Sequence, residues 1–147
     1  MYIRKIAYAL ILFGALGGIA AAQKVSITVK LINGKTGRVL ANQHMLLGSF
    51  TSGTGWQEPY DGKTDKDGLV TFSVDLQRDK LLTVDVDDFM TACEEKGHAC
   101  EIPLADILST GVIMPGLWSH RVAPEKDVPG RIVVYVRKVT FWDKMKV

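Results

Sequence analysis

Several short runs of this 147-residue chain alternate strictly between apolar and polar residues. In Val25–Leu31 every second residue is a large aliphatic one, and the residues between them are Ser, Thr and Lys. The same period of two recurs in Leu69–Leu76 and in Leu81–Val86. Because successive side chains of a strand point to opposite faces, this period predicts strands with one buried face and one face in water.

The segments around these runs predict a sheet protein. Asn33–Gly37 is rich in Gly and Asn and predicts a tight turn. Val39–Leu47 has apolar ends and a polar middle, which predicts an edge strand interrupted by a bulge or a bend. Ile132–Val136 is apolar on both faces, as is typical of a central strand. We therefore expect a mainly β fold, a single Ig-like or prealbumin-like antiparallel β-sandwich over residues 23–147.

Residues 89–129 break this pattern and are expected to form a short helical or irregular insertion. Within them, Pro103–Gly111 has its apolar residues at helical spacing, with Pro early and Gly late, which predicts a helix of two turns. Asp106 would then lie on the solvent side of this helix. Three of the five prolines fall in Met114–Gly130, which is expected to be an irregular connection.

The first 22 residues have the pattern of a secretory signal peptide. Arg4 and Lys5 precede the uncharged apolar run Ile6–Ala22, and small residues there predict cleavage before Gln23. The alternative is an uncleaved N-terminal membrane anchor, although the run is shorter than the roughly 20 residues that a spanning helix needs. We expect a secreted or periplasmic protein of the cell envelope, with membrane contact through an uncleaved leader if at all.

The charge balance excludes nucleic acid as an expected partner. The chain has 18 basic and 16 acidic residues, and loss of the leader removes Arg4 and Lys5, so 16 remain of each sign. The remaining basic residues are scattered and form no stripe that could follow a phosphate backbone. The expected partner is an unidentified protein or carbohydrate at the envelope, and no cofactor is expected.

The chain has two cysteines, Cys93 and Cys100. In an exported chain they predict a disulfide, which would stabilise this short loop by about 2–3 kcal/mol. Free thiols are one alternative. A metal site formed with His98 is another, but it lacks the fourth ligand that structural zinc sites have, so no metal is expected.

Aromatic residues stand out in the Ser/Thr/Gly-rich segment Ser49–Tyr60, which is expected to be a long surface loop. These aromatics either fold back over an open end of the core or form a recognition surface. In the second interpretation, residues of the insertion join them in a candidate ligand surface composed of Phe50, Trp56, Tyr60, His98 and Trp118.

The segment KTDKDGLVTFSV partly fits a twelve-position calcium loop, with aspartates at positions three and five and glycine at six. Positions one and twelve are Lys63 and Val74, where calcium needs oxygen ligands. We therefore predict a turn, in which Asp65 and Asp67 bond backbone amides and Gly68 is left-handed, followed by a strand.

The stretch VSITVKLINGKTGRVLANQHMLL, followed by TDKDGLVTFSV, resembles the secreted carboxypeptidase regulatory-like, prealbumin-like β-sandwich superfamily, which includes collagen-adhesin B-type repeats. The resemblance covers Val25 to Val74 and implies the fold, while it says almost nothing about activity. Adhesin repeats can form a Lys–Asn isopeptide crosslink, but the alternation places Lys30 on the solvent face. The related hydrolases use a His near the first strand, whereas the first His after the leader is His44.

No catalytic residues are expected. The three histidines are His44, His98 and His120, and no hydrolase, zinc-protease or phosphate-loop motif accompanies them. Ser119 and His120 are adjacent, and neighbours on an extended strand point to opposite sides. The sequence thus predicts an exported non-catalytic binding or structural module. The alternative is an accessory domain or enzyme that acts on carbohydrate or peptide through its aromatic surface.

The C-terminal segment ends with an aromatic pair, Phe141 and Trp142, between lysines. We expect the pair to close the core, because burying aromatic area stabilises a fold by several kcal/mol. The alternative is an apolar tail for a partner or a membrane surface.

Overall fold

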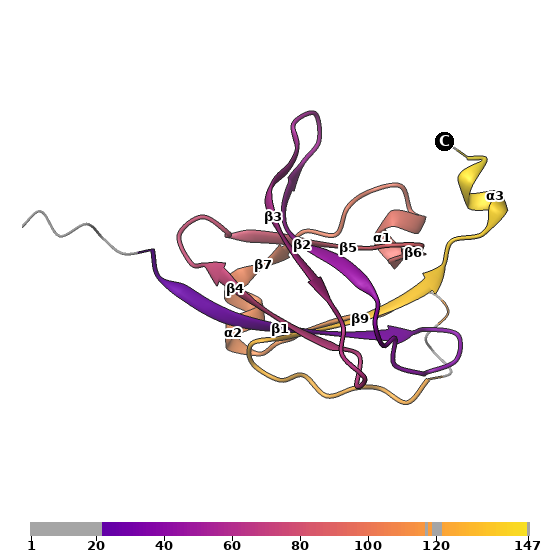
Figure 1. Cartoon of the computed structure of the whole chain (residues 1–147), viewed down its shortest axis with the longest axis horizontal. Coiled ribbons are helices and arrows are strands. Elements are labelled where there is room, and N and C mark those ends of the chain that lie inside the picture. Colours follow the sequence, from indigo (N-terminus) through magenta and orange to yellow (C-terminus); the bar gives the residue numbers. More distant parts are fainter. Residues whose placement is uncertain (1–21, 117, 119–121, 147) are drawn as a thin grey trace, which may run out of the picture.

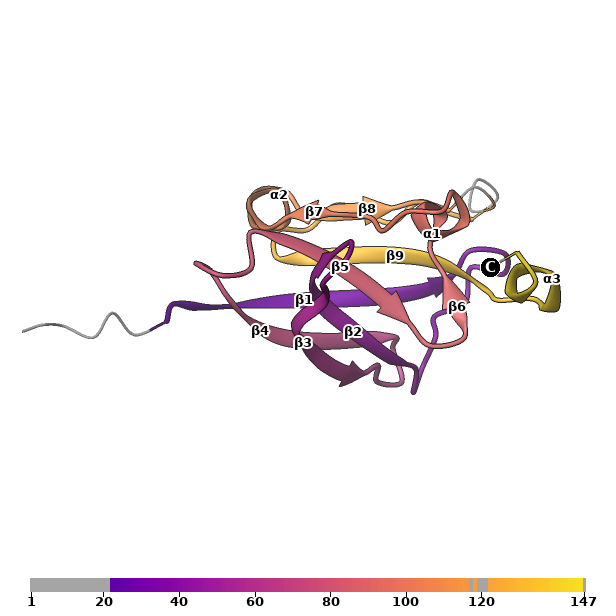
Figure 2. The same ribbon diagram turned by 90° about the horizontal axis from the view of Figure 1, so that it is seen from above.

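The computed structural model describes residues 22–116, 118 and 122–146, and these form two β-sheets packed face to face (Figures 1 and 2). One sheet has the order β4 (Leu69–Asp75), β1 (Lys24–Asn33), β9 (Arg131–Lys138) and β6 (Phe89–Met90), and β8 (Val112–Met114) also pairs with β9. The other sheet has the order β3 (Gly55–Lys63), β2 (His44–Thr51), β5 (Leu81–Val86) and β7 (Ile102–Pro103). The predicted mainly β sandwich is confirmed.

Strand pairing is mixed in the first sheet, so the sandwich is not wholly antiparallel as expected. β1 pairs antiparallel with β4, whereas β9 runs parallel to β1, with Thr28 opposite Arg131. β8 is also parallel to β9. All pairings in the second sheet are antiparallel.

The alternating runs supply the core between the sheets, as predicted. In β1, Ile27, Val29 and Leu31 are fully buried, and the residues between them face outward. The same core contains residues of five other elements of the sandwich: Met45, Leu47, Phe72, Val74, Leu82, Val84, Val86, Ile102, Ile132, Val134 and Val136.

β9 is covered on both faces, which confirms the prediction of a central strand. Its other face carries Val133 and Tyr135, which form a second apolar cluster with Ile32. Ile113 and Val122 pack on this cluster from the segment that follows the insertion's helix. The apolar residues on both faces of β9 are therefore explained by the core on one face and, on the other, by the neighbouring strand β8 and the segment that begins at Val122.

The insertion contains more sheet than expected. α1 (Ala92–Glu95) and α2 (Leu104–Ser109) are short helices, and α2 matches the predicted helix, with Asp106 exposed. The insertion also contributes β6, β7 and β8 to the two sheets. These strands have two or three residues each, too few for a period of two to be recognised.

Two predictions about β2 and β3 are wrong. β2 lies between β3 and β5, so it is not an edge strand, although the predicted bend is present at Asn42, whose φ is 55°. Ser49–Tyr60 is no long loop, because β2 and β3 continue through it as a hairpin whose tip projects from the sandwich (Figure 1). Phe50 and Trp56 form a cross-strand pair, and such pairs stabilise a hairpin in spite of polar, Gly-rich neighbours.

The turn before β4 is present. Asp65 Oδ1 accepts hydrogen bonds from the backbone N–H of Asp67 and of Leu69, at 2.8 and 3.0 Å. Gly68 has a φ of 74°, and a Cβ there would lie 2.9 Å from the carbonyl oxygen of Leu31. Asp65 accepts both of these hydrogen bonds. Asp67 was also expected to bond backbone amides, but its side chain is exposed to solvent.

The C-terminal aromatic pair does not close the core, which corrects the expectation. α3 (Phe141–Lys144) leaves Phe141 67% and Trp142 71% exposed. The helix is joined to the end of β9 through its polar side, where the Arg137 guanidinium bonds both carboxylate oxygens of Asp143 at 2.7 and 2.9 Å. This pairing also holds the pKa of Asp143 well below its usual range.

Residues 1–21 of the predicted leader and the Ser119–His120 pair lie outside the described residues. Within the described part of the chain, no helix is both long enough and apolar enough to span a bilayer.

Candidate functional site

The predicted disulfide is present between Cys93 and Cys100, whose Cα atoms are 5.3 Å apart. It closes a loop that begins with α1 and ends at β7. At the start of α1, Thr91 and Glu94 form a capping box, in which the Glu94 carboxylate accepts the backbone N–H of Thr91 at 2.5 Å. The loop is thus fixed at both ends, and a hollow lies on each side of it.

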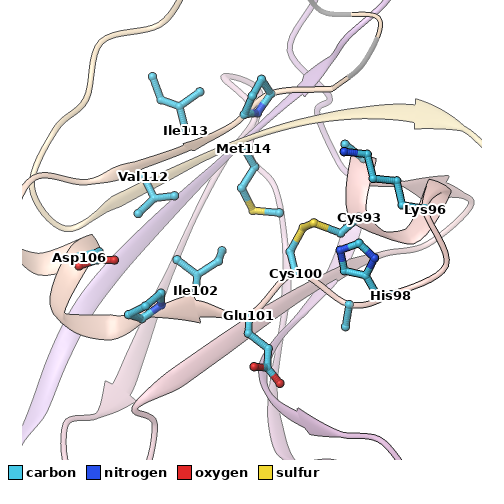
Figure 3. A pocket seen from close by; sticks show the side chains of 14 residues that line it. Cys93, Lys96, His98, Cys100, Glu101, Ile102, Asp106, Val112, Ile113 and Met114 are labelled. Atoms are coloured by element: carbon cyan, nitrogen blue, oxygen red, sulfur yellow. A yellow bond between two sulfur atoms is a disulfide. The ribbon is translucent and has the colours of Figure 1, made fainter.

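The first hollow, called here the apolar hollow, has a volume of about 510 Å³ and lies between the disulfide loop, β7, α2 and β8. Figure 3 shows Ile102, Val112 and Met114 around its middle. Asp106 lies at one end, and His98 lies at the other beside the disulfide (Figure 3). This hollow exposes mainly aliphatic groups and lacks a convergent set of reactive ones.

The second hollow, called here the aromatic hollow, lies between the disulfide loop and the β2–β3 hairpin. Its volume is about 350 Å³. Phe50 and Trp56 form one wall, with ring centroids 5.4 Å apart and an interplanar angle of 64°. His98 lies on the opposite wall and also lines the apolar hollow. The complete lining is Phe50, Trp56, Thr83, Val84, Asp85, Glu94, Gly97, His98 and Ala99.

The floor of the aromatic hollow is polar. Thr83 is 4% exposed, and its Oγ1 has no hydrogen-bond partner among the described residues. Burial raises the pKa of Asp85, and the charge of Asp87 raises it further. Burial also raises the pKa of Glu94, with a smaller contribution from the charge of Asp85. The floor thus holds an unpaired hydroxyl and two carboxyl groups whose charged forms are disfavoured.

The candidate ligand surface predicted from the sequence is brought together in part. Phe50, Trp56 and His98 meet at the aromatic hollow, whereas Tyr60 and Trp118 lie elsewhere. Trp118 packs on Gly34 at the end of β1, and the Arg137 guanidinium lies 5.8 Å from its ring centroid. Neither residue lines the aromatic hollow.

Tyr60 has a structural role at the edge of the core. Its ring packs against Phe72, and its hydroxyl donates to the buried carboxylate of Asp79 at 2.5 Å. Asp79 also accepts the backbone N–H of Asp75 at 2.9 Å and Nε–H of Arg78 at 3.0 Å. Burial alone would raise the pKa of Asp79, but these hydrogen bonds outweigh it and lower the pKa.

The contacts of His44 with two aspartates were not predicted from the sequence. His44 lies between two carboxylates, with Nδ1 2.8 Å from Asp87 and Nε2 2.7 Å from Asp61. Hydrogen bonds to Asp61 and Asp87 raise its pKa, because both carboxylates favour the imidazolium. Such a doubly paired imidazolium has no basic nitrogen left, so this geometry is suited to joining β2, β3 and the turn after β5, not to abstracting a proton.

Three residues of the aromatic hollow, Thr83, Asp85 and Glu94, were also missed. Thr83 and Asp85 occupy the polar positions of the alternating run in β5, which places them on the outer face. That signal was available, but polar positions of a strand are normally solvated. What distinguishes these two is the disulfide loop above them, and the sequence does not show where this loop lies.

Lys30 lies on the outer face of β1 as predicted, but it is not simply solvated. Its Nζ is 2.8 Å from Oε1 of Glu125, in the segment that covers this face. Among residues 22–116, 118 and 122–146, no cluster of three or more His, Cys, Asp or Glu side chains is arranged to hold a metal ion.

Comparison with known proteins leaves the chain without an assigned relative: no family model, no curated protein and no solved structure gives a significant match. The resemblance to the carboxypeptidase regulatory-like superfamily therefore stays a prediction.

Proposed function

We propose that this protein is an exported, non-catalytic binding domain of the cell envelope, and that the aromatic hollow is its ligand site. The observation that carries the proposal is the convergence of Phe50 and Trp56, from the hairpin, with His98, from the disulfide loop. A concave site lined by aromatic side chains and a few fixed polar groups is the usual form of a small-ligand site.

The disulfide and the leader pattern support the location. Disulfides persist in oxidising compartments, and the Cys93–Cys100 bridge fixes one wall of the aromatic hollow. Export would therefore be a condition for the site, because a reduced loop would be less constrained. In this proposal the leader is cleaved before Gln23 and the product is secreted or periplasmic, the alternative being a leader retained as an anchor.

The aromatic pair also favours a second candidate, an accessory domain that holds a carbohydrate or a peptide for another protein. Both candidates need ligand binding at the same residues. They differ in whether a partner enzyme acts on what is bound.

Binding can be tested with residues 23–147 and a panel of short oligosaccharides, peptides and small amines, followed by amide and indole NMR signals. We expect at least one member to shift the signals of Phe50, Trp56 and His98, with the shifts lost in Trp56→Ala. Trp142→Ala serves as the matched control, because Trp142 is exposed and far along the chain from the hollow. If no member of the panel perturbs the aromatic hollow, the proposed function is wrong.

A further inference from the structure

We propose that the aromatic hollow binds an alkylammonium group, as found in a lysine side chain or a small aliphatic amine. The inference rests on the proposed function and specifies the chemical class of its ligand. Three observations carry it: the orphaned hydroxyl of Thr83, the two carboxyl groups on the floor, and the aromatic wall.

The first observation is the unpaired hydroxyl group of Thr83. Its side chain lines the hollow, is almost completely buried, and leaves Oγ1 without a partner among the described residues. A buried polar atom without a hydrogen bond destabilises a fold, so such atoms are rare unless something else satisfies them. A ligand with an N–H or O–H donor would satisfy this oxygen.

The two carboxyl groups favour a ligand whose donor group is positively charged. Asp85 and Glu94 lie on the same floor, and His98 is the one basic side chain that lines the hollow. The side chain of His98 is exposed to solvent. Burial disfavours ionisation of both carboxyl groups, and neighbouring negative charge adds to it, from Asp87 on Asp85 and from Asp85 on Glu94. A bound cation would oppose these effects, whereas a neutral ligand would leave them in place.

The number of acceptors suits an ammonium group. An ammonium carries three N–H donors, and Thr83, Asp85 and Glu94 are three acceptor-bearing residues of the lining. Glu94 uses one oxygen, Oε2, for the cap of α1, and its carboxylate has a second oxygen. Guanidinium and anionic ligands fit less well, the first because it is planar and prefers paired oxygens, the second because of charge.

The aromatic wall accommodates the rest of the ligand. Phe50 and Trp56 meet edge to face across the β2–β3 pair, and both line the hollow. Aromatic faces attract cations within about 6 Å of the ring centre, and Trp does so best. The same rings bury the alkyl chain that carries the ammonium, which a bare metal ion or ammonia would not exploit.

The experiment uses residues 23–147 and three probes in calorimetry and NMR titrations. They are 1,5-diaminopentane, the neutral 1,5-pentanediol of the same length, and Nα-acetyl-lysine N-methylamide. We expect both amines to shift the signals of Trp56 and Thr83, and the diol to bind at least about tenfold more weakly, because it lacks charge-assisted hydrogen bonds. Tighter binding of the lysine derivative than of the diamine identifies a protein lysine as the natural source, and the reverse identifies a free amine.

Matched variants separate the site from general electrostatics. Asp85→Asn should weaken the binding of both amines roughly tenfold or more, and Thr83→Val, which keeps the side-chain shape, about fivefold. Asp106→Asn removes an exposed carboxylate at the apolar hollow and should change binding less than about twofold.

Two results would overturn the inference. If the diol binds as tightly as the amines, or a neutral oligosaccharide binds at the hollow while the amines do not, the ligand is not a cation, although the proposed binding function stands. If Asp85→Asn and Asp106→Asn have equal effects, amine binding reflects the overall charge and not this site.

Discussion

Asp79 is the one charged residue among the buried residues of the described chain. Its carboxylate is satisfied by Tyr60, Arg78 and the backbone of Asp75, so it is a structural charge that ties β3 to the turn after β4. Hydrogen bonds to charged groups stabilise a fold more than neutral ones do, and removing one buried partner leaves the others unsatisfied.

We expect Asp79→Ala to lower the free energy of unfolding by about 2–3 kcal/mol in urea denaturation. Glu58→Gln is the matched control, because Glu58 bonds the same Arg78 at 2.6 Å but is 83% exposed. That change should cost less than about 0.5 kcal/mol. Equal effects of the two variants would contradict a structural role for the buried carboxylate.

His44 predicts a pH dependence of stability. Its pKa is raised above 6.5 in the folded protein by Asp61 first and Asp87 second. A raised pKa means that the folded state binds the proton more tightly than the unfolded state, so this stabilisation is fully present below 6.5 and is lost as the pH rises through the raised value.

The measurement is the Tm of wild type and of His44→Gln across neutral pH. The wild type should exceed the variant most on the acidic side of pH 6.5, and the difference should shrink as the pH rises. A difference that grows with pH would mean that His44 is stabilising as the neutral imidazole, against the geometry of its two carboxylate partners.

At the scale of the elements, periodicity predicted what depends on local pattern. β1, β4, β5 and α2 were recognisable because each has enough residues for its buried face to repeat, and β9 was recognisable because it is apolar on both faces. The hairpin at Ser49–Tyr60 was not, since its stability depends on the cross-strand pair Phe50–Trp56, and pairing register is not a property of either strand alone.

The candidate site shows the same division. His98, Phe50 and Trp56 were singled out as unusual residues for their positions, and they do meet at the aromatic hollow. Asp85 and Thr83 could not be singled out from the sequence, because both occupy polar positions of an alternating strand, and such positions are normally solvated. They line a hollow because the disulfide loop, from another part of the chain, lies over this outer face of β5.

At the scale of the whole molecule, one mass measurement tests both the cleavage of the leader and the oxidation of the two cysteines. We expect the intact mass of the protein recovered from the envelope or medium to correspond to Gln23–Val147 with two hydrogens removed, and to gain those two hydrogens on reduction. A mass that includes the leader supports the anchored alternative. A mass unchanged by reductant contradicts a disulfide in the exported protein.

The parallel pairing of β1 with β9 joins two strands that lie far apart in the sequence. Thr28 lies opposite Arg131 and Asn33 opposite Val136, so the inner edge of β1 has no partner until nearly the whole chain has been synthesised. Pairings this distant in sequence form late, because the loop between them must be closed first. A chain of this design cannot complete its sandwich early in synthesis. If the protein is exported as proposed, this late closure keeps the chain unfolded for translocation and leaves folding to the compartment where its cysteines are oxidised.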